Sequence, residues 1–356
     1  MKKQERIFVI GHKNPDTDSI CSAIAYADIK NRTTQSKRYI PKRAGQINEE
    51  TRYVLNRFGV QPPAYLGNIG TQVKDRDIRL TPQADKNMSL KNTWDLMQEN
   101  GIVSLPIRDK EGCLEGLVTI GDIAKTYMDT TDSYLLSNAR TQYQRIAETV
   151  GGEVVEGNGH GYFVKGRVLV GTANPKMMEE FIEENDMIIM GDREEDHLQA
   201  ISQNVSCIIV GLNIVVSEKV VKLAHEKNIV IIRSPYDTFN IARLINQSIP
   251  VSYVMKRDNM VTFNTEDFTD DIQDVMVKNR HRAFPVINPH GKCIGTISRR
   301  NFLDMHKKKV VLVDHNEVDQ AVDNIEKAEI LEIIDHHKLG TLQTMTPVAF
   351  RNEPVG

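Results

Sequence analysis

The sequence predicts an α/β fold in which a parallel-sheet domain is interrupted by a long insertion. Short runs of β-branched and other apolar residues lie near both ends of the chain, and each run stops at a cluster of acidic and histidine residues. Runs of this length and composition are typical of buried parallel strands. Residues 71–308 separate the runs and contain an internal repeat, which indicates a separate inserted region.

The first run, Ile7–Ile10, leads into GHKNPDTDS and then into apolar positions with helical spacing from 20 to 27. His12, Asp16 and Asp18 therefore occupy a strand-to-helix loop, where α/β sheets usually bind ligands. Capping of the helix by Asp or Ser explains this stretch as well as a metal or phosphate site does.

Two further runs near the end of the chain repeat the pattern. VVLV stops at Asp314, ILEII stops at Asp335-His336-His337, and helical spacing between them, from Val318 to Ile325, predicts a strand–helix–strand unit. A parallel crossover places both strand ends at one edge of a sheet. We therefore expect the three clusters to converge in one crevice.

The side chains in these clusters predict a metal-assisted phosphohydrolase. Histidine and carboxylate without thiolate suit Mn²⁺, Co²⁺ or Mg²⁺ better than a structural zinc. So many carboxylates would repel one another unless cations lay among them. Two metals about 3.5–4 Å apart could activate a water for attack on phosphorus, and the positive end of the following helix favours an anion. Hydrolysis of a phosphoanhydride or a phosphodiester fits this chemistry.

GHKNPDTDS, VDHNE and IDHHK together resemble the DHH phosphoesterases, and specifically the manganese-dependent family II inorganic pyrophosphatases. The DHH phosphodiesterases that cut short oligonucleotides or cyclic dinucleotides typically carry glycine where this chain has Thr17. SICSAIAYADIKNR and EETRYVLNRFG also look like the pyrophosphatase branch.

This resemblance implies an inorganic diphosphatase that binds two or more Mn²⁺ or Co²⁺ ions, with Mg²⁺ accompanying the substrate pyrophosphate. The implied ligands are His12, Asp16 and Asp314 for one metal, and Asp18, Asp314 and His336 for the other. Asp314 would bridge the two metals. As further catalytic groups, His337 would face the substrate and Asp335 would support the histidines from behind.

The insertion contains two copies of one pattern. With Leu96–Asn100 placed on Val275–Asn279, no gap is needed over about 30 residues, roughly one helix–strand–turn–strand module. The matching pairs are Pro106 and Pro285, Gly112 and Gly291, Gly116 and Gly295, Thr119 and Ser298, and Asp122 and Asn301. Each copy reads as a helix, a strand, a glycine turn, a strand and the start of a helix, so we expect the copies to pair.

LPIRDKEGCLEGLVTIGDI and FPVINPHGKCIGTISRRNF resemble CBS domains, which pair and bind adenine nucleotides. The resemblance implies ribose and phosphate contacts at Thr119, Asp122, Ser298 and Asn301. Arg282 and Arg299 are candidates for phosphate contact, because a guanidinium matches phosphate oxygens; a solvated helix start explains Arg299 equally well. AMP or ADP would be the regulatory ligand.

Between the copies, MIIMGD, CIIVGLN and IVIIRS alternate with helical stretches. This segment resembles the DRTGG domain of CBS-containing pyrophosphatases, with GDREED in place of the naming motif, and would extend the nucleotide site toward diadenosine polyphosphates. The expected domains are the DHH domain in two parts (1–70 and 309–356), CBS 1 (71–132), the DRTGG-like domain (133–249) and CBS 2 (250–308).

Composition and the chain end complete the expectations. A net charge of -3 gives no reason to expect a nucleic-acid or membrane partner. Four scattered cysteines and the lack of a signal-like segment favour the cytoplasm. By the resemblance, one more metal-binding aspartate and a basic C-terminal catalytic domain would lie beyond EPVG, so we expect the chain to be C-terminally incomplete. A homodimer is expected because CBS pairs commonly stack across chains.

Three functions are compatible with these observations. The first is a pyrophosphatase regulated by adenine nucleotides, in which reorientation of the CBS pair would act on Asp314. The second is a catalytically silent adenine-nucleotide sensor. The third is a DHH phosphodiesterase acting on oligonucleotides or cyclic dinucleotides, against which Thr17 and the CBS insertion argue.

Overall fold

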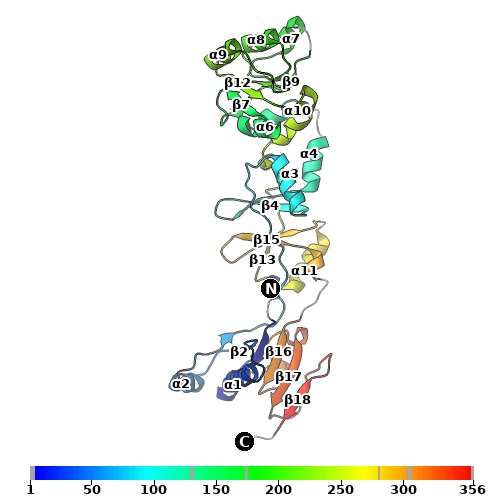
Figure 1. Ribbon diagram of the computed structural model, residues 1–356. Helices are drawn as coiled ribbons and strands as arrows, with labels where there is room; N and C mark the ends of the chain where they lie inside the picture. The colour runs from blue at the N-terminus through cyan, green and yellow to red at the C-terminus, as the bar shows by residue number, and fades with distance from the viewer. Residues whose placement is uncertain (1–4, 129–131, 173–174, 280, 303–306, 354–356) are drawn as a thin grey trace. The chain divides into compact units, whose positions relative to one another are not determined.

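The computed structural model describes residues 5–128, 132–172, 175–279, 281–302 and 307–353. They fall into two compact units, and Figure 1 labels helices and strands of both. The first unit comprises residues 1–77, 265–280 and 299–356, and the second comprises 78–264 and 281–298. The second unit therefore interrupts the first, as the sequence predicts, although the domain boundaries proposed above stay predictions.

A six-stranded sheet forms the first unit, in the order β18-β17-β16-β1-β2-β3. All five neighbouring pairs are parallel, which confirms the predicted parallel sheet. The strands are β1 (Ile7–Ile10), β2 (Tyr39–Arg43), β3 (Ala64–Tyr65), β16 (Lys309–Val313), β17 (Glu329–Asp335) and β18 (Ala349–Asn352). The helical elements are α1 (Thr17–Thr33), α2 (Glu49–Arg57), η1 (Val73–Asp75), α11 (Thr269–Lys278), η4 (Arg299–Phe302), η5 (Val318–Gln320) and η6 (Ile325–Lys327).

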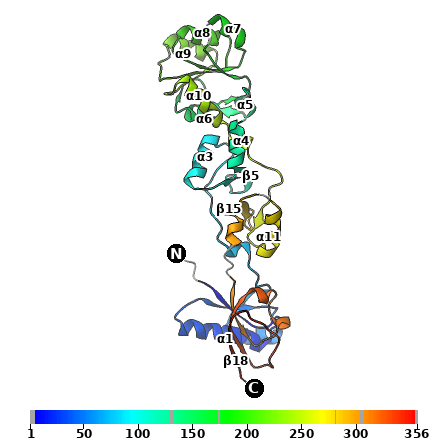
Figure 2. The same ribbon diagram turned by 90° about the vertical axis from the view of Figure 1, so that its right-hand side faces the viewer.

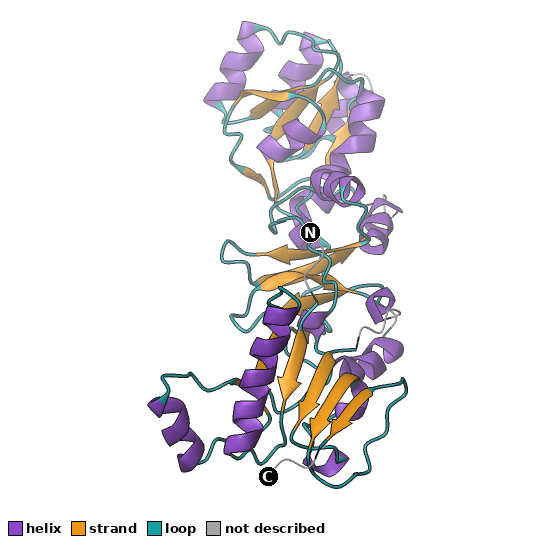
Figure 3. Ribbon diagram, turned by 60° about the horizontal axis from the view of Figure 1, so that its bottom comes forward, coloured by secondary structure: helices purple, strands orange, loops and turns teal. Residues whose placement is uncertain are grey.

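Helix α1 is the long helix that lies along the sheet in Figure 3. Ala23 and Ala27 on its inner face are buried with Val9 and Val311 of the central strands. The turn from β1 into α1 requires glycine at position 11, since a Cβ there would lie 1.9 Å from Ser19 Oγ. A side chain would push the first turn of α1 away from the end of β1.

The helix expected between Val318 and Ile325 is not formed. The chain instead makes the two short 3₁₀ turns η5 and η6, separated by Asn324 in the left-handed conformation (φ 63°). Neighbouring segments use the backbone groups that a helix would have paired internally: Lys13 N donates to Gln320 O (2.8 Å) and Ile69 N donates to Asp323 O (3.0 Å). Ala321, Val322 and Ile325 of the apolar spacing are still buried, whereas Val318 is exposed, and these tertiary hydrogen bonds replace the helix.

The internal repeat is confirmed by elements that begin and end at equivalent positions. The first copy holds α3 (Leu90–Glu99), β4 (Ser104–Arg108), β5 (Leu114–Thr119) and α4 (Ile120–Met128). The second holds β13 (Phe263–Asn264), α11, β14 (Phe284–Ile287), β15 (Cys293–Ile297) and η4. Both hairpins are antiparallel and carry an irregularity at the equivalent place, Ile107/Arg108 and Val286/Ile287. Residues 303–306, directly after η4, lie outside the described part of the chain.

The hairpins of the two copies are joined by Arg108, whose side chain is buried. Its guanidinium donates to Cys293 O (3.1 Å) in the other copy, and to Thr81 O (2.8 Å) and Pro82 O (2.5 Å) in the preceding segment. Backbone bonding continues the contact, because Cys293 N donates to Gly112 O (2.9 Å). The copies therefore pair, as predicted.

The α/β segment between the copies is a three-layer arrangement, with helices on both faces of a sheet (Figure 1 and Figure 2). Its sheet has the order β7-β12-β11-β10-β9, with β7 antiparallel to β12 and the others parallel. One core lies between this sheet and α8 and α9, and another between the sheet and α6 and α10. The strands are β6 (Thr141–Gln142), β7 (Glu153–Glu156), β8 (Tyr162–Phe163), β9 (Val168–Val170), β10 (Met187–Met190), β11 (Cys207–Val210) and β12 (Val230–Arg233). The helices are α5 (Leu135–Asn138), α6 (Tyr143–Thr149), α7 (Pro175–Phe181), α8 (Glu194–Ser202), α9 (Glu218–Glu226), α10 (Thr238–Leu244), η2 (Ile245–Ser248) and η3 (Val251–Tyr253).

The cysteines and the helix lengths bear on where the chain can function. All four cysteines are free. Within the described residues, no helix combines the length and the apolar character needed to cross a bilayer.

Arg108→Met should destabilise the second unit. Removing the guanidinium leaves buried carbonyl oxygens of both copies without a donor, which costs about 1–3 kcal/mol. The measurement is the urea midpoint followed by circular dichroism. Lys110→Met, an exposed substitution in the same hairpin, is the matched control; equal midpoints for the two variants would contradict the assigned role of Arg108.

Candidate metal centre

The structure brings the three acid and histidine clusters together at the carboxyl edge of the six-stranded sheet. Each cluster follows a parallel strand: His12 follows β1, Asp314 follows β16, and His336 follows β17. In the sheet order, β16 lies between β1 and β17. The residue at the end of β16 therefore faces the loops of both neighbours.

Asp314 occupies the middle of this centre. Its Oδ2 lies 3.3 Å from His12 Nε2, and its Oδ1 lies 3.5 Å from His336 Nε2. Its carboxylate is buried, and Oδ2 makes no well-aligned hydrogen bond. The backbone of Asp314 is left-handed (φ 60°), a conformation that costs a non-glycine residue roughly 1–3 kcal/mol. This strain aims the carboxylate at both histidines.

On the β1 side, Asp16 caps α1 and also lies close to His12, so capping, one of the two explanations that the sequence left open, is confirmed. Its Oδ1 caps α1 by accepting a hydrogen bond from Ser19 N (2.9 Å), and the same oxygen lies 3.8 Å from His12 Nε2. The Asp314 carboxylate raises the pKa of His12 above its usual value, although burial works in the opposite direction. His12 is therefore surrounded by negative charge.

On the β17 side, His336 Nδ1 lies 3.9 Å from Asp18 Oδ2, and His337 Nδ1 lies 3.8 Å from Asp314 Oδ1. Buried Asp335 holds this loop: its Oδ1 accepts from the backbone N of His336 (2.8 Å) and of His337 (3.2 Å). The same oxygen lies 2.8 Å from His337 Nδ1. These contacts agree with the supporting position expected for Asp335.

The donor set fits divalent cations. Within the described residues, two groups of ligand atoms converge: His12, Asp16 and Asp314 form one, and Asp314, His336 and His337 form the other. Asp314 is common to both, and its buried Oδ2 lacks the partner that a buried carboxylate oxygen needs. Asp18 lies near the second group through His336. Imidazole and carboxylate ligands without sulfur suit Mn²⁺ or Co²⁺.

Two residues of the VDHNE motif have roles that sequence reasoning missed. Asn316 is buried and donates to Asp335 Oδ2 and to Lys338 O (2.9 Å), so it joins the loops after β16 and β17. His315 is also buried; its Nδ1 is hydrogen-bonded to Val313 O (2.9 Å), and burial lowers its pKa. Their place in the motif was the available signal.

Thr17, which distinguishes the sequence from the phosphodiesterases, lies at the start of α1. Its hydroxyl is 3.2 Å from the hydroxyl of buried Thr51 on α2. Glycine at this position could not make that contact. The residue therefore ties α2 to the loop that carries His12 and Asp16.

The predicted nucleotide residues lie at the strand ends of the two repeats. Thr119 and Asp122 form a compact turn in the first copy, where Thr119 Oγ1 donates to Asp122 Oδ2 (2.6 Å). Lys256 Nζ lies 3.6 Å from the other carboxylate oxygen of Asp122. A hydroxyl, a carboxylate and an ammonium group are thus adjacent in the first copy, and ribose and phosphate contacts at this turn stay a prediction.

The equivalent turn of the second copy differs. Arg299 Nη2 donates to Met276 O and to Asn279 O (2.6 Å) at the end of α11, and Asn301 Nδ2 donates to Asp77 O (2.7 Å). Ser298 precedes this turn and Arg282 is exposed. The Arg299 guanidinium thus caps a helix, and its phosphate contact, like that of Arg282, stays a prediction.

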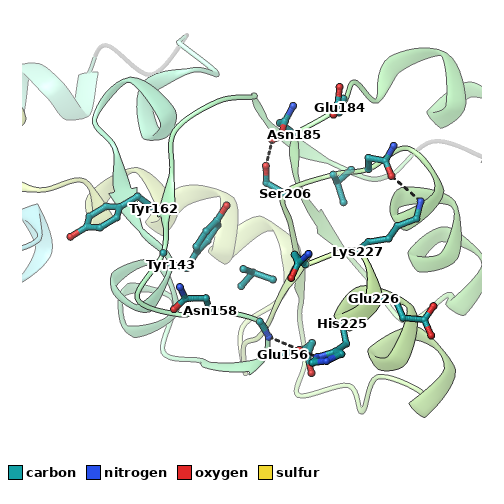
Figure 4. A pocket seen from close by; sticks show the side chains of 16 residues that line it. Tyr143, Glu156, Asn158, Tyr162, Glu184, Asn185, Ser206, His225, Glu226 and Lys227 are labelled. Atoms are coloured by element: carbon teal, nitrogen blue, oxygen red, sulfur yellow. Dashed lines mark hydrogen bonds and ion pairs between the residues drawn. The ribbon is translucent and has the colours of Figure 1, made fainter.

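An open groove lies in the α/β segment (Figure 4). Its charged lining includes Glu156, Glu184 and Glu226. Lys227 also lines it, but Nζ already donates to Ile201 O (2.9 Å) and Asn204 Oδ1 (2.8 Å). A polyphosphate chain would meet three carboxylates here. We therefore do not place the nucleotide in this groove.

Comparison with known proteins begins with the domains. The DRTGG domain family matches residues 145–248, and the CBS domain family matches residues 81–129 and 251–308. A solved structure holds the CBS and DRTGG domains of the regulatory region of Clostridium perfringens pyrophosphatase with the activator diadenosine tetraphosphate. Its sequence is 33% identical to the matching part of this chain. The two align with a TM-score of 0.61 over 64% of this chain and 100% of that chain.

Similarity extends to the site-bearing unit. The cobalt-dependent inorganic pyrophosphatase of Clostridium perfringens is 40% identical over 351 residues, which cover 98% of this chain and 64% of that protein. A probable manganese-dependent inorganic pyrophosphatase of Thermotoga maritima is 37% identical over 356 residues, 100% of this chain and 65% of that protein. The chain belongs to this family of inorganic pyrophosphatases. It spans slightly under two thirds of the length of these relatives.

Asp314→Asn should weaken Mn²⁺ binding at both halves of the centre, because one neutral amide replaces the carboxylate that both halves share. Asp16→Asn should weaken only the half that contains His12. The measurement is the number of Mn²⁺ ions bound per chain, from the free-Mn²⁺ signal in electron paramagnetic resonance. Identical binding curves for the two variants would contradict a bridging position for Asp314.

Proposed function

We propose that the protein hydrolyses inorganic pyrophosphate to two phosphates at the metal centre, and that adenine nucleotides bound by the CBS pair regulate this reaction. One observation carries the catalytic part: the two oxygens of buried Asp314 face histidines that follow different strands. This arrangement suits a pair of metals bridged by one carboxylate. The similarity to the Clostridium and Thermotoga pyrophosphatases supports pyrophosphate as the substrate.

The proposed ligands are His12, Asp16, Asp18, Asp314 and His336. Bound there, Mn²⁺ or Co²⁺ would supply an activated water and offset charge on the phosphate oxygens, with Mg²⁺ accompanying the substrate. The chain's residues hold the geometry: Asp16 fixes the start of α1, and Asp335 fixes the loop of His336.

His337 has the properties of a group that meets the substrate. Its side chain is half exposed, and its Nδ1 is held by Asp335. The hydrogen bond to Asp335 raises the pKa of His337, while its slight burial lowers it. A raised pKa favours the protonated ring, so Nε2 can donate a hydrogen bond to a phosphate oxygen and stabilise the negative charge that develops there.

The catalytic proposal predicts phosphate release from pyrophosphate by the purified full-length protein with Mn²⁺, and its loss after EDTA treatment. His337→Ala should lower kcat by about 10²-fold or more, as expected for loss of a hydrogen-bond donor to the developing charge, while Mn²⁺ binding is kept. The assay is colorimetric detection of phosphate. A folded, metal-loaded protein that releases no phosphate would leave nucleotide sensing as its function.

Regulation is supported by contacts that residues 265–280 of the second repeat make within the site-bearing unit. Residues 265–280 belong to that unit, although the repeat assigns them to the second copy. Lys74 N donates to Thr265 O (2.9 Å), Thr269 N donates to Thr71 O (2.9 Å), and Lys327 Nζ lies 2.5 Å from Asp270 Oδ2. A change in the second copy would therefore reach the segments next to β16.

The nucleotide part of the proposal rests on Thr119, Asp122, Ser298 and Asn301, with Arg282 and Arg299 as candidates for phosphate contact. Diadenosine polyphosphates are a further candidate ligand, since the related regulatory region was solved with diadenosine tetraphosphate. A homodimer is part of the same proposal, because two CBS pairs could share a ligand with two adenosine groups.

Asp122→Ala should weaken AMP binding by about tenfold or more, because it removes the acceptor next to Thr119 and Lys256. Isothermal calorimetry on the purified protein measures the affinity. Asp95→Ala is the matched control, since Asp95 forms only an exposed pair with Lys91. Equal affinities for the two variants would place the nucleotide elsewhere.

A further inference from the structure

Strand β17 carries a glutamate where its neighbours are apolar. The strand reads EILEIID, and Glu332 stands in its middle between Leu331 and Ile333. A register shift leaves Leu331 as an extra residue, because Val310 pairs with Ile330 and Val311 pairs with Glu332. Such a bulge re-aims the side chains beyond it. It places Glu332 on the sheet face covered by α1.

The carboxylate of Glu332 is fully engaged by α1. Its Oε2 accepts from the Tyr26 hydroxyl (2.5 Å), and its Oε1 lies 2.5 Å from Lys30 Nζ. Burial raises the pKa of Glu332, but the hydrogen bonds from Lys30 and Tyr26 outweigh burial and lower it. Tyr26 of α1 and Leu331 and Ile334 of β17 pack against the same buried cluster, which includes Ala23 and Val311. These contacts join α1 to a strand that is two places away from β1 in the sheet.

Helix α1 and β17 are thus connected at two places, once in the metal centre and once through Glu332. Asp18 on α1 faces His336 after β17, and Tyr26 on the same helix faces Glu332 on the strand. Asp18 and Tyr26 are eight residues apart on a helix, about 12 Å. Glu332 and His336 are four residues apart at the end of a strand, about 13 Å. The helix and the strand thus run antiparallel with two matched contacts.

An apolar side chain at 332 could bury as much surface without the cost of placing an ion pair at a half-buried position. Replacement of such pairs by apolar residues is often neutral or stabilising. Stability alone therefore does not account for the pair. A charged pair does restrict how a helix can slide or rotate over a strand, because its partners must meet at fixed positions.

We propose that Glu332, with Tyr26 and Lys30, positions α1 so that Asp18 and His336 meet at one half of the metal centre. The three are positioning residues, because they contact one another and do not touch the substrate. This inference rests on the proposed metal centre. The half of the centre that contains Asp18 and His336 would then depend on three residues outside the motifs GHKNPDTDS and IDHHK.

The test is Mn²⁺ binding by the full 356-residue chain, with stoichiometry and affinity from electron paramagnetic resonance. The triple variant Tyr26→Phe, Lys30→Met and Glu332→Leu keeps an apolar contact between α1 and β17. We expect it to retain the wild-type unfolding midpoint and to bind one Mn²⁺ normally and the other about tenfold more weakly, as when an outer partner of a metal ligand is removed. It should resemble Asp18→Asn and not Asp16→Asn.

The matched control replaces a pair on the exposed face of the same helix, Asp28→Asn with Arg32→Met, whose side chains lie 2.8 Å apart. This control should bind both ions as the wild type does. Should the triple variant not fold, Glu332→Gln decides, with a smaller loss at the same half. Unchanged binding by these variants, beside a wild type that binds two ions, overturns the positioning role alone. A wild type that binds no Mn²⁺ overturns the metal centre and the positioning role together.

Discussion

The site-bearing unit depends on Asp314, because its two carboxylate oxygens face histidines that come from different parts of the chain. His12 follows β1 and His336 follows β17, and β16 lies between these strands. The left-handed backbone at Asp314 aims the carboxylate, and burial prevents water from satisfying it. A buried carboxylate among so many acids is stable only with cations nearby. Asp314 therefore combines a strained backbone conformation with a place in both groups of potential metal ligands.

The insertion leaves and re-enters the sheet through neighbouring points. Lys308, directly before β16, donates to Gly70 O (2.9 Å) and lies 2.9 Å from Asp75 Oδ2. The residue directly before β16 is therefore held by contacts with residues 70 and 75, and Asp314 follows the other end of this strand. Domain insertions are tolerated where the two connection points are close together, since the host fold closes without them.

The two repeats have equivalent secondary structure, but the side chains at their last turns make different contacts. Thr119 and Asp122 form a turn with Lys256 beside it, whereas Arg299 and Asn301 donate to backbone carbonyls of their own unit. The two turns therefore offer a ligand different groups.

The sequence by itself determined the parallel sheet and the repeat and predicted the acid and histidine clusters at the sheet edge, because apolar strand runs, matching glycines and clustered ligand types are local patterns. It did not determine that the segment from Val318 to Ile325 would form 3₁₀ turns, because its backbone partners, Lys13 and Ile69, are distant in sequence. Nor could it show that Arg299 caps α11, or that Glu332 meets Tyr26 and Lys30 across the sheet. Only the tertiary structure decided these contacts, since they depend on strand order and on a bulge in β17.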